Sequence, residues 1–471
     1  MSIRMGVVFL VLVLTGCPGT GEPSPAGTPD AGGVTPNGCF QVPEDSPLWS
    51  GEGFMLGTEK GEEFLDVAVD SQGTLFLAGY ENGDVGASRF DPSGDSRGVL
   101  WRMGRADGAT IGKKVFDIPD ATETLDALAF HPDTGALYFA GRTTGAFEGF
   151  TPRGAQDIFI VGPRGSESDV ILYQGGTERP QHPNRLDFDA HRDLIVSGYD
   201  DVYVPPGGNY VERWEDPFVL KLRWAEEGRS MAEVWWRQFD TSISDMLGGL
   251  AVDSQGDSAI YVTGTNSNGT QDGPFVRKID NATGQLGSPW RQTTIGMDMM
   301  QAAHLRADGS LLIAGSTFAR LGTQAYGEQD VVVRVLDTST GQPVWTTQFG
   351  SEGSEWVTDM AVDAQGNILV VGETLGAVDP AQGNRGDYDV FLMKFDPEGK
   401  LLLARQWGSA GDDHPNAVAV DACGEVFIVG YTTGDLLGPR FPWNGSRDAF
   451  LLTTARPGGR LLSREKSEKQ W

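Results

Sequence analysis

The stretch Asp359-Met-Ala-Val-Asp-Ala-Gln-Gly-Asn-Ile-Leu-Val-Val-Gly372 occurs, with changes, seven times along this chain of 471 residues. A close copy is Asp66-Val-Ala-Val-Asp-Ser-Gln-Gly-Thr-Leu-Phe-Leu-Ala-Gly79. Every copy ends in a glycine, and these closing glycines are Gly79, Gly141, Gly198, Gly264, Gly315, Gly372 and Gly430. Neighbouring closing glycines are 51 to 66 residues apart. A repeat of this length, built from short alternating segments, is typical of a propeller, so seven copies predict seven blades.

The sixth copy shows how one blade is built. Residues 358–363 alternate apolar and polar side chains, as a half-buried strand does, and 367–373 form an apolar run that suits burial on both faces. A long polar loop leads to a third strand at 389–396, and a Pro-Glu-Gly-Lys turn leads to a fourth at 401–407. We therefore predict an all-β fold, a seven-bladed propeller of four-stranded antiparallel blades.

These repeats resemble the bacterial beta-propeller repeat family called SBBP. The resemblance is carried by the closing-glycine stretch, by third strands such as Asp389-Val-Phe391, and by outer strands such as Val344-Trp-Thr-Thr-Gln-Phe349. It extends over about residues 48–466, and it is weakest near Phe188-Asp-Ala-His-Arg-Asp193, where the turn glycine is missing. The resemblance implies a propeller in a cell-surface setting. It implies no particular reaction, because propellers carry many unrelated functions.

Residues 1–17 are predicted to be a lipoprotein signal peptide. Arg4 provides a positive start, and the ten-residue apolar core Met5–Leu14 is too short for a bilayer, which needs about 20 apolar residues. Leu14-Thr-Gly-Cys17 is similar to the bacterial lipobox, so Cys17 is the predicted lipidation site. An ordinary cleaved signal with a chance cysteine is the alternative.

The predicted signal peptide is followed by a predicted tether at residues 18–47 and by the propeller at 48–471. Pro18–Gly38 holds repeated Pro, Gly, Ser and Thr with almost no apolar side chains, and such a segment cannot order itself by burial. We therefore expect an exported protein, lipid-anchored in the bacterial cell envelope, at the outer membrane or cell surface. The lipid is expected to be its single membrane attachment.

The net charge of the chain limits the kinds of partner that it can bind. There are 36 Lys and Arg against 65 Asp and Glu, a formal net charge of −29. Such a chain repels phosphate backbones and anionic lipid, which disfavours nucleic acid as a partner. We expect a monomer whose partner is an envelope protein or a glycan.

The three cysteines predict one disulfide bond. With Cys17 lipidated, Cys39 and Cys423 remain as an even pair in an oxidising compartment. Cys423 falls in the turn between the first two strands of the last blade, and Cys39 precedes residues 48–57, which resemble an outer strand. If this N-terminal strand completes the last blade, the two cysteines lie on one face. Two free thiols are the alternative.

The sequence matches motifs for catalysis and metal binding only in part. Gly94-Asp-Ser-Arg-Gly98 fits the nucleophile-elbow pattern, but it falls in a loop without the strand and helix that the motif needs. His182 and His414 are each followed by proline, so we expect solvent-exposed loop residues. Asp200-Asp201 and Asp412-Asp-His414 lack the alternating oxygen ligands of a calcium loop.

Two segments, Asp280-Asn-Ala-Thr-Gly284 with Trp290 and Asp337-Thr-Ser-Thr-Gly341 with Trp345, are similar to repeats of quinoprotein dehydrogenases. That resemblance would imply a central quinone and calcium. It is limited to two copies, and no Cys-Cys pair accompanies it. The simpler interpretation is a hairpin turn before an outer strand whose Trp packs between blades. We predict no catalytic residue, no cofactor and no metal ligand.

Aromatic residues in the long loops are the remaining candidates for a site. The predicted binding face contains Tyr203, Trp214, Trp356 and Trp443. We expect a binding or interaction module. One alternative is a propeller enzyme, either a quinoprotein-type dehydrogenase or a loop-carboxylate hydrolase, with its site over the central channel. A purely structural envelope protein is another. Ionisable side chains converging at the channel mouth would favour an enzyme, and a broad aromatic and acidic surface would favour binding.

Overall fold

The described residues all belong to one compact unit of the chain. The computed structural model describes residues 53–83, 96–104, 110–203, 213–225, 229–239, 245–254, 256, 259–266, 273–291, 298–321, 326–439, 442–444 and 446–454. They fall within the compact unit Thr35–Trp471, and the other unit, Met1–Val34, lies outside the description. The predicted signal peptide, tether and lipidation site therefore lie outside the described residues.

The described strands form seven four-stranded antiparallel sheets. From inner to outer strand, blade 1 is β2 (Gly61–Val69), β3 (Leu75–Gly83), β4 (Arg97–Met103) and β5 (Thr110–Phe116); blade 2 is β6 (Glu123–Phe130), β7 (Leu137–Thr143), β8 (Asp157–Arg164) and β9 (Glu167–Gly175); blade 3 is β10 (Gln181–Phe188), β11 (Leu194–Tyr203), β12 (Arg213–Trp224) and β13 (Met231–Gln238); blade 4 is β14 (Asp245–Val252), β15 (Ala259–Asn266), β16 (Gly273–Asp280) and β17 (Trp290–Arg291). Blade 5 is β18 (Met299–Leu305), β19 (Leu311–Thr317), β20 (Asp330–Leu336) and β21 (Pro343–Phe349); blade 6 is β22 (Glu355–Val362), β23 (Ile368–Thr374), β24 (Asp389–Phe395) and β25 (Leu401–Trp407); blade 7 is β26 (Asp413–Val420), β27 (Val426–Thr432), β28 (Asp448–Thr453) and β1 (Gly53–Leu56).

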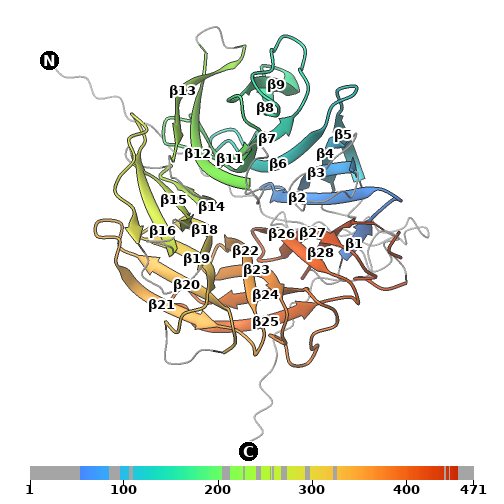
Figure 1. The fold of residues 1–471 in the computed structure, drawn as a ribbon, viewed down its shortest axis with the longest axis vertical. Helices are drawn as coiled ribbons and strands as arrows, with labels where there is room; N and C mark the ends of the chain where they lie inside the picture. The colour runs from blue at the N-terminus through green and yellow to red at the C-terminus, as the bar shows by residue number, and fades with distance from the viewer. Residues whose placement is uncertain are drawn as a thin grey trace, which may run out of the picture. The chain divides into compact units, whose positions relative to one another are not determined.

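The seven sheets follow one another around a common axis (Figure 1). The inner strand of each blade contacts the inner strand of the next, and β26 of blade 7 contacts β2 of blade 1, which closes the ring. The predicted seven-bladed propeller is confirmed, and the strands expected in the sixth copy agree with β22–β25 to within a few residues.

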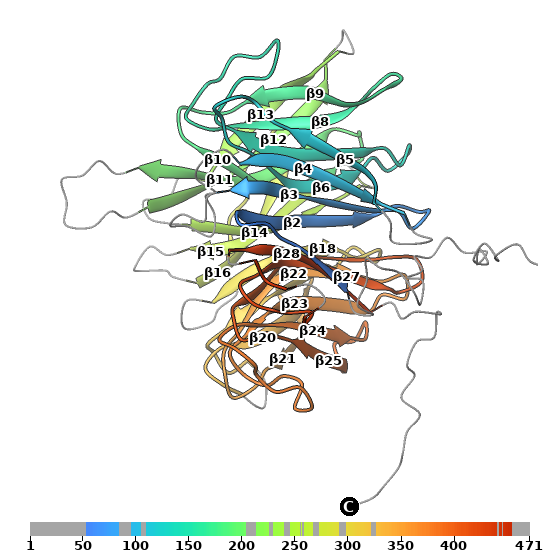
Figure 2. The ribbon, with the colours of Figure 1, turned by 90° about the vertical axis from the view of Figure 1, so that its right-hand side faces the viewer.

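The N-terminal strand β1 is the outer strand of the last blade, as predicted. It pairs antiparallel with β28, from Gly53 opposite Leu452 to Leu56 opposite Ala449. Figure 2 shows the ring from its side, with the blue start of the chain against the red end. The first and last strands of the repeat region therefore share one sheet, which leaves no unpaired edge on β28.

Each closing glycine lies opposite a β-bulge in the inner strand. A Cβ on Gly372 would lie 1.9 Å from the backbone oxygen of Trp356, and all seven closing glycines would meet an inner-strand carbonyl within 2.2 Å. The ladder skips one or two inner-strand residues at this point. The residues skipped, here called the bulge ring, are Leu65, Asp126, Asn184, Gly248 with Gly249, Gln301, Thr358 and Asn416. The repeated glycine is therefore required by a bulge that presses the neighbouring strand against it.

The antiparallel order separates two faces. Connections from first to second and from third to fourth strand lie on one face, here the short-turn face; the remaining connections lie on the opposite, long-loop face. In blade 6 the Asp363 carboxylate accepts hydrogen bonds from the backbone N–H groups of Gln365 and Asn367, and Gly366 between them has φ +80°. This is the tight turn that the repeated Asp and Gly predict.

Cys423 occupies the equivalent turn of blade 7, where its N–H donates to Asp421 at 2.8 Å. The cysteine is disulfide-bonded. Cys17 and Cys39 both lie outside the described residues, so the pairing of Cys39 with Cys423 stays a prediction. No helix among the described residues is long and apolar enough to cross a membrane.

Outer-strand tryptophans pack against turn glycines of the next blade. A Cβ on Gly341 would lie 2.5 Å from the ring of Trp290, and one on Gly399 would lie 2.6 Å from the ring of Trp345. Both glycines have positive φ, at 71° and 86°. The aspartate–glycine segments with their tryptophans thus have a packing role between blades.

Candidate functional site

A cavity of about 560 Å³ lies on the axis of the ring. All seven inner strands contribute to its wall, and every position of the bulge ring is represented there. Trp356 near the start of β22, Glu373 near the end of β23 and Tyr388 in the loop before β24 also line it, so it lies towards the long-loop face. A β-bulge turns its extra residue out of the hydrogen-bonded ladder. Because every blade has this bulge, the extra residues together form one cavity wall.

The bulge ring is mostly uncharged. Asn184, Gln301 and Asn416 supply carboxamides and Thr358 a hydroxyl, whereas Asp126 is its one carboxylate. Each carboxamide carries both donors and an acceptor. Asn184 uses its carboxamide within the protein, donating to the Leu247 carbonyl at 3.0 Å and accepting from Ser197 Oγ at 3.1 Å. The Gln301 carboxamide and Asn416 Oδ1 are the groups of this ring suited to hydrogen-bonding a polar ligand.

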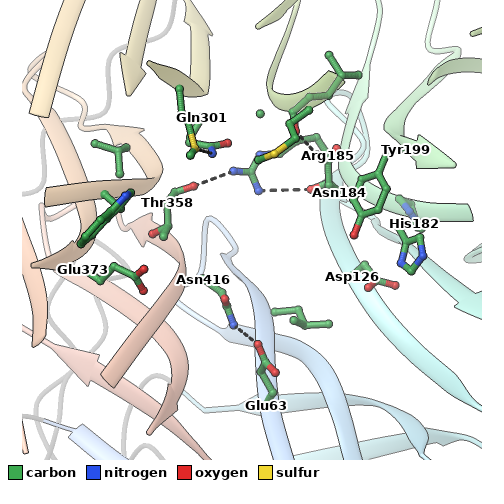
Figure 3. Close-up of a pocket in the computed structure, with 18 of the residues that line it drawn as sticks. Glu63, Asp126, His182, Asn184, Arg185, Tyr199, Gln301, Thr358, Glu373 and Asn416 are labelled. Carbon is green, nitrogen blue, oxygen red and sulfur yellow. Dashed lines mark hydrogen bonds between the residues drawn. The ribbon is translucent and has the colours of Figure 1, made fainter. Parts of the chain in front are cut away.

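Arg185 reaches across the axis from blade 3 to blade 6 (Figure 3). Its guanidinium donates to Asp359 Oδ1 at 3.0 Å, to the Thr358 carbonyl at 3.4 Å and to the Asn184 carbonyl at 3.3 Å. The side chain is 27% exposed and lines the cavity. Burial raises the pKa of the neighbouring Asp66 carboxyl to about 7, with Asp359 adding to this effect and Arg185 opposing it.

The wall formed by blades 2 and 3 holds a histidine stacked on a tyrosine. The rings of His182 and Tyr199 are 4.6 Å apart at 9°. Arg142 contacts His182 Nδ1 and donates through Nε to Thr124 Oγ1 at 2.9 Å. Its Nε also lies 3.5 Å from Asp126, whose pKa is raised by burial against the opposing charge of Arg142.

The expectation that His182 and His414 are exposed loop residues is wrong. Both are buried, at 4% and 8% exposure, and both lie on inner strands. The prolines that follow, Pro183 and Pro415, sit at the edge of the bulges, where the ladder is interrupted. A proline lacks an N–H, and an interrupted ladder tolerates that loss.

Blades 6 and 7 form an aromatic wall. Trp356 meets Tyr388 edge-on, with ring centroids 5.7 Å apart at 61°, and Tyr388 lies 5.1 Å from the ring of His414. His414 Nδ1 hydrogen-bonds the Glu373 carboxylate. Trp356 was predicted from its loop position, and the structure places it at the start of β22, half-buried in the cavity wall.

Glu63 is held by its neighbours at the junction of blades 1 and 7. It accepts a hydrogen bond from Tyr80 Oη at 2.8 Å. It accepts another from Asn416 Nδ2, also at 2.8 Å (Figure 3). Arg447 lies 3.9 Å away. With Asp126 and Glu373, this makes three carboxylates in the wall, each with a polar or charged partner.

The structure describes only one of the other predicted aromatic side chains, that of Trp443. Tyr203 and Trp214 lie at the ends of β11 and β12, paired with Arg213 and Val202, on the long-loop side; their side chains are outside the description. Trp443 is 41% exposed, its N–H donates to Asp435 at 2.7 Å, and it is not among the cavity residues. Of the two predicted aromatics whose side chains are described, Trp356 lines the cavity and Trp443 does not.

Asp200 and Asp413, one from each acidic segment considered for calcium, are buried near the long-loop face. Burial raises the pKa values of Asp200 and Asp413 to about 6. Asp413 accepts hydrogen bonds from Ser409 and Thr432. Within the described ranges, no group of three or more His, Cys, Asp or Glu side chains could hold a metal ion.

Residues 344–378 match the model of the beta-propeller repeat family SBBP. They run from the outer strand of blade 5 through the first two strands of blade 6. This segment is an SBBP repeat. It contains Trp356, Thr358 and Glu373 of the cavity wall, so the SBBP repeat itself provides part of the site.

Other comparisons are distant. No curated protein sequence matches the chain. Among solved structures, the polysaccharide lyase Uly1 is similar at 11% identity, with 84% of this chain and 90% of that chain covered and a TM-score of 0.46. Chaetomium thermophilum Sqt1, solved with the N-terminus of the ribosomal protein L10, is similar at 12% identity, covering 85% and 98%, with a TM-score of 0.44. Likenesses this distant say nothing of a ligand or a reaction.

Sequence reasoning missed most of the cavity. Arg185, His182 and Tyr199 lie in the copy that departs most from the SBBP pattern, and nothing in their local sequence marks them as a site. A usable signal did exist. Aligning the copies on their closing glycines places Asn184, Gln301, Thr358 and Asn416 in one column, and a column of polar residues within a repeat that is otherwise apolar would have indicated the wall.

Proposed function

We propose that this protein is a lipid-anchored binding module of the bacterial envelope, with its ligand site in the central cavity and no catalytic role. The observation that carries the proposal is the bulge ring, which brings carboxamides and a hydroxyl from Asn184, Gln301, Thr358 and Asn416 to one cavity wall. The cavity volume of about 560 Å³ falls in the range of about 300–1,000 Å³ typical of small-ligand sites.

The ionisable groups converge at the channel mouth, the arrangement that would favour an enzyme. Their contacts support binding instead. Glu63 is engaged by Tyr80 and Asn416, Glu373 by His414, and Arg185 by Asp359. Ionisable side chains that bind one another hold the cavity wall in one shape, because each partner restrains the other.

Ligand capture is tested with material from the native envelope. The mature protein and a Thr358→Trp variant, whose added ring fills the cavity, are mixed with the dialysable fraction of native envelope extract. We expect the thermal midpoint to rise for the wild type and to stay constant for Thr358→Trp, because a ligand stabilises the state that binds it. The same response from both proteins, or no response from either, would contradict the proposed site.

The anchor is tested separately. Cys17→Ser is expected to abolish metabolic labelling by palmitate and to move the protein from the membrane to the released fraction. The physical reason is that a ten-residue apolar core cannot span a bilayer, so the acyl chains would be the attachment. Retention of the Cys17→Ser variant in membranes after salt and carbonate washes would show another attachment.

A hydrolase is the second candidate, and Asp126 is the observation that favours it. This carboxyl projects from the bulge ring into the cavity, and burial raises its pKa, as a general acid requires. The test incubates the wild type and Asp126→Asn with the envelope fraction and follows new reducing ends. If the wild type forms product and Asp126→Asn does not, the protein is an enzyme and the binding proposal is wrong.

A further inference from the structure

We infer that the central cavity binds the ring of a neutral saccharide, between the aromatic wall of blade 6 and that of blade 3. The inference rests on the proposed ligand site and names the ligand class. Four observations support it: the paired charges of the wall, the two aromatic side chains, the polar groups left available, and the cavity volume.

Each charged group of the wall is engaged within the protein, Glu63 by Tyr80 and Asn416. Asp126 lies 3.5 Å from Arg142, Arg185 donates to Asp359 at 3.0 Å, and Glu373 hydrogen-bonds His414. A strongly anionic or cationic ligand would have to break one of these pairs and leave its partner buried, which is costly. A neutral ligand avoids that cost.

Aromatic rings line the cavity on two sides. Trp356 is half-buried in the wall of blade 6, and its edge-on contact with Tyr388 fixes its orientation. Tyr199 lines the wall of blade 3 and is backed by the parallel ring of His182. Arg185 spans the distance between these blades. The C–H faces of a sugar ring offer flat apolar surface, which rigid aromatic rings can cover.

Polar groups remain available between the aromatic walls. The Gln301 carboxamide has one contact in the described part of the chain, at 3.6 Å to Met299 Sδ. Asn416 uses Nδ2 for Glu63 and for the Phe64 carbonyl, which leaves its Oδ1 as an acceptor. Each sugar hydroxyl is both donor and acceptor, so carboxamides are matched to it in both roles.

Arg185 adds donors at the centre of the cavity. Its guanidinium has five N–H groups, and its hydrogen bonds to Asn184, Thr358 and Asp359 use the two terminal nitrogens. Two of these contacts, at 3.3 and 3.4 Å to backbone carbonyls, are long and weak. A saccharide oxygen can therefore accept a hydrogen bond from Arg185 without breaking the Asp359 pair.

Titration calorimetry of the mature protein tests the ligand class. The neutral probes are trimers of glucose in α-1,4 and in β-1,4 linkage, of xylose, of mannose and of N-acetylglucosamine. The charged probes are trimers of galacturonate and of glucosamine. We expect a neutral trimer to bind and the charged trimers to bind at least about tenfold more weakly.

Variants locate the site. Trp356→Ala is expected to weaken binding of the neutral trimer by about tenfold or more, and Gln301→Ala by about fivefold, while Trp356→Phe keeps part of the affinity. Trp443→Ala is the matched control, since Trp443 is an exposed tryptophan outside the cavity residues. Circular dichroism and the thermal midpoint show that each variant is folded.

The outcomes separate this inference from the proposed function. If a charged trimer binds more tightly than the neutral trimers, and this binding is lost in Trp356→Ala, the ligand is not neutral. The cavity then remains the binding site. Binding that is lost in Trp443→Ala and kept in Trp356→Ala moves the site to the loops and overturns both. If no trimer binds but the envelope fraction still stabilises the wild type and not Thr358→Trp, the saccharide inference fails and the binding function stands.

Discussion

At the scale of single residues, the closing glycine explains why one stretch recurs along the chain. The inner strand bulges towards the glycine in every blade, and there is no room for a side chain between them. The same bulge turns a residue of the bulge ring into the cavity. The β-bulge therefore explains both the repeated glycine and the cavity wall. Each repeat must keep the bulge for all seven blades to line the cavity.

Gly372→Ala is expected to destabilise the protein by about 1–3 kcal/mol, because the new methyl group would lie 1.9 Å from the Trp356 carbonyl and push β22 aside. Urea unfolding monitored by tryptophan fluorescence measures this. Gly112→Ala in β5 is the control, since a Cβ there has no neighbour within 4 Å, and its midpoint should stay close to that of the wild type. Equal midpoints for the two variants would refute the steric argument.

At the scale of elements, β1 joins the two ends of the repeat region. It pairs with β28 of blade 7, and Phe54 packs edge-on against Phe64 of blade 1, with ring centroids 6.3 Å apart. The adjacent Glu62 N–H donates to the Arg447 carbonyl at 2.9 Å. The short strand therefore contributes both a ladder and a side-chain contact to the closing junction.

Deleting residues 48–57 is expected to cause aggregation and faster proteolysis, because β28 would become an unpaired edge. Light scattering and limited trypsin digestion follow the two effects. A synthetic peptide of residues 48–57, added in excess, should restore protection, while a scrambled peptide should not. A deletion variant that stays monomeric with unchanged melting would show that this strand is dispensable for closure.

The disulfide of Cys423 is predicted to link the short-turn face of blade 7 to Cys39. Non-reducing peptide mapping of protein from its native host should find both residues in one crosslinked peptide. Cys423→Ser is then expected to lower the unfolding free energy by up to about 5 kcal/mol, the chain-entropy value for a long loop. Recovery of a peptide in which Cys39 is alkylated without prior reduction would contradict this pairing.

At the scale of the whole molecule, buried carboxyls make stability depend on pH. Burial raises the pKa of Asp66 to about 7 and those of Asp187, Asp200 and Asp413 to about 6. The unfolded values are about 3.9, so the native state holds protons that the unfolded state has released. Stability from these groups is complete below about pH 4 and is lost as the pH rises through 6 to 7.

The thermal midpoint is therefore expected to be higher at pH 5 than at pH 8, measured by calorimetry at constant ionic strength. The net charge of −29 acts in the same direction, since deprotonation adds to self-repulsion. Asp66→Asn should reduce the difference between the two pH values, because an amide does not titrate. A midpoint that rises from pH 5 to pH 8 would be incompatible with these shifts.

Much of the fold follows from the sequence, since the signals are local. The closing glycines set the number of blades, Asp363 and Gly366 mark a tight turn, and residues 48–57 resemble an outer strand. Each feature depends on the backbone geometry of a few neighbouring residues, and repetition reinforces it. The loop prediction for His182 and His414 was wrong, because proline follows both residues and is found at bulges as well as in loops.

The cavity was decided by the tertiary structure. Arg185 and Asp359 are 174 residues apart, and they meet because ring closure brings blades 3 and 6 to a common axis. The repeats cannot predict which side chains form the cavity wall, because those residues differ from blade to blade. The sequence alone determined the seven blades and the N-terminal closing strand, because both rest on short-range patterns. Which side chains face one another across the axis depends on the position of all seven inner strands at once.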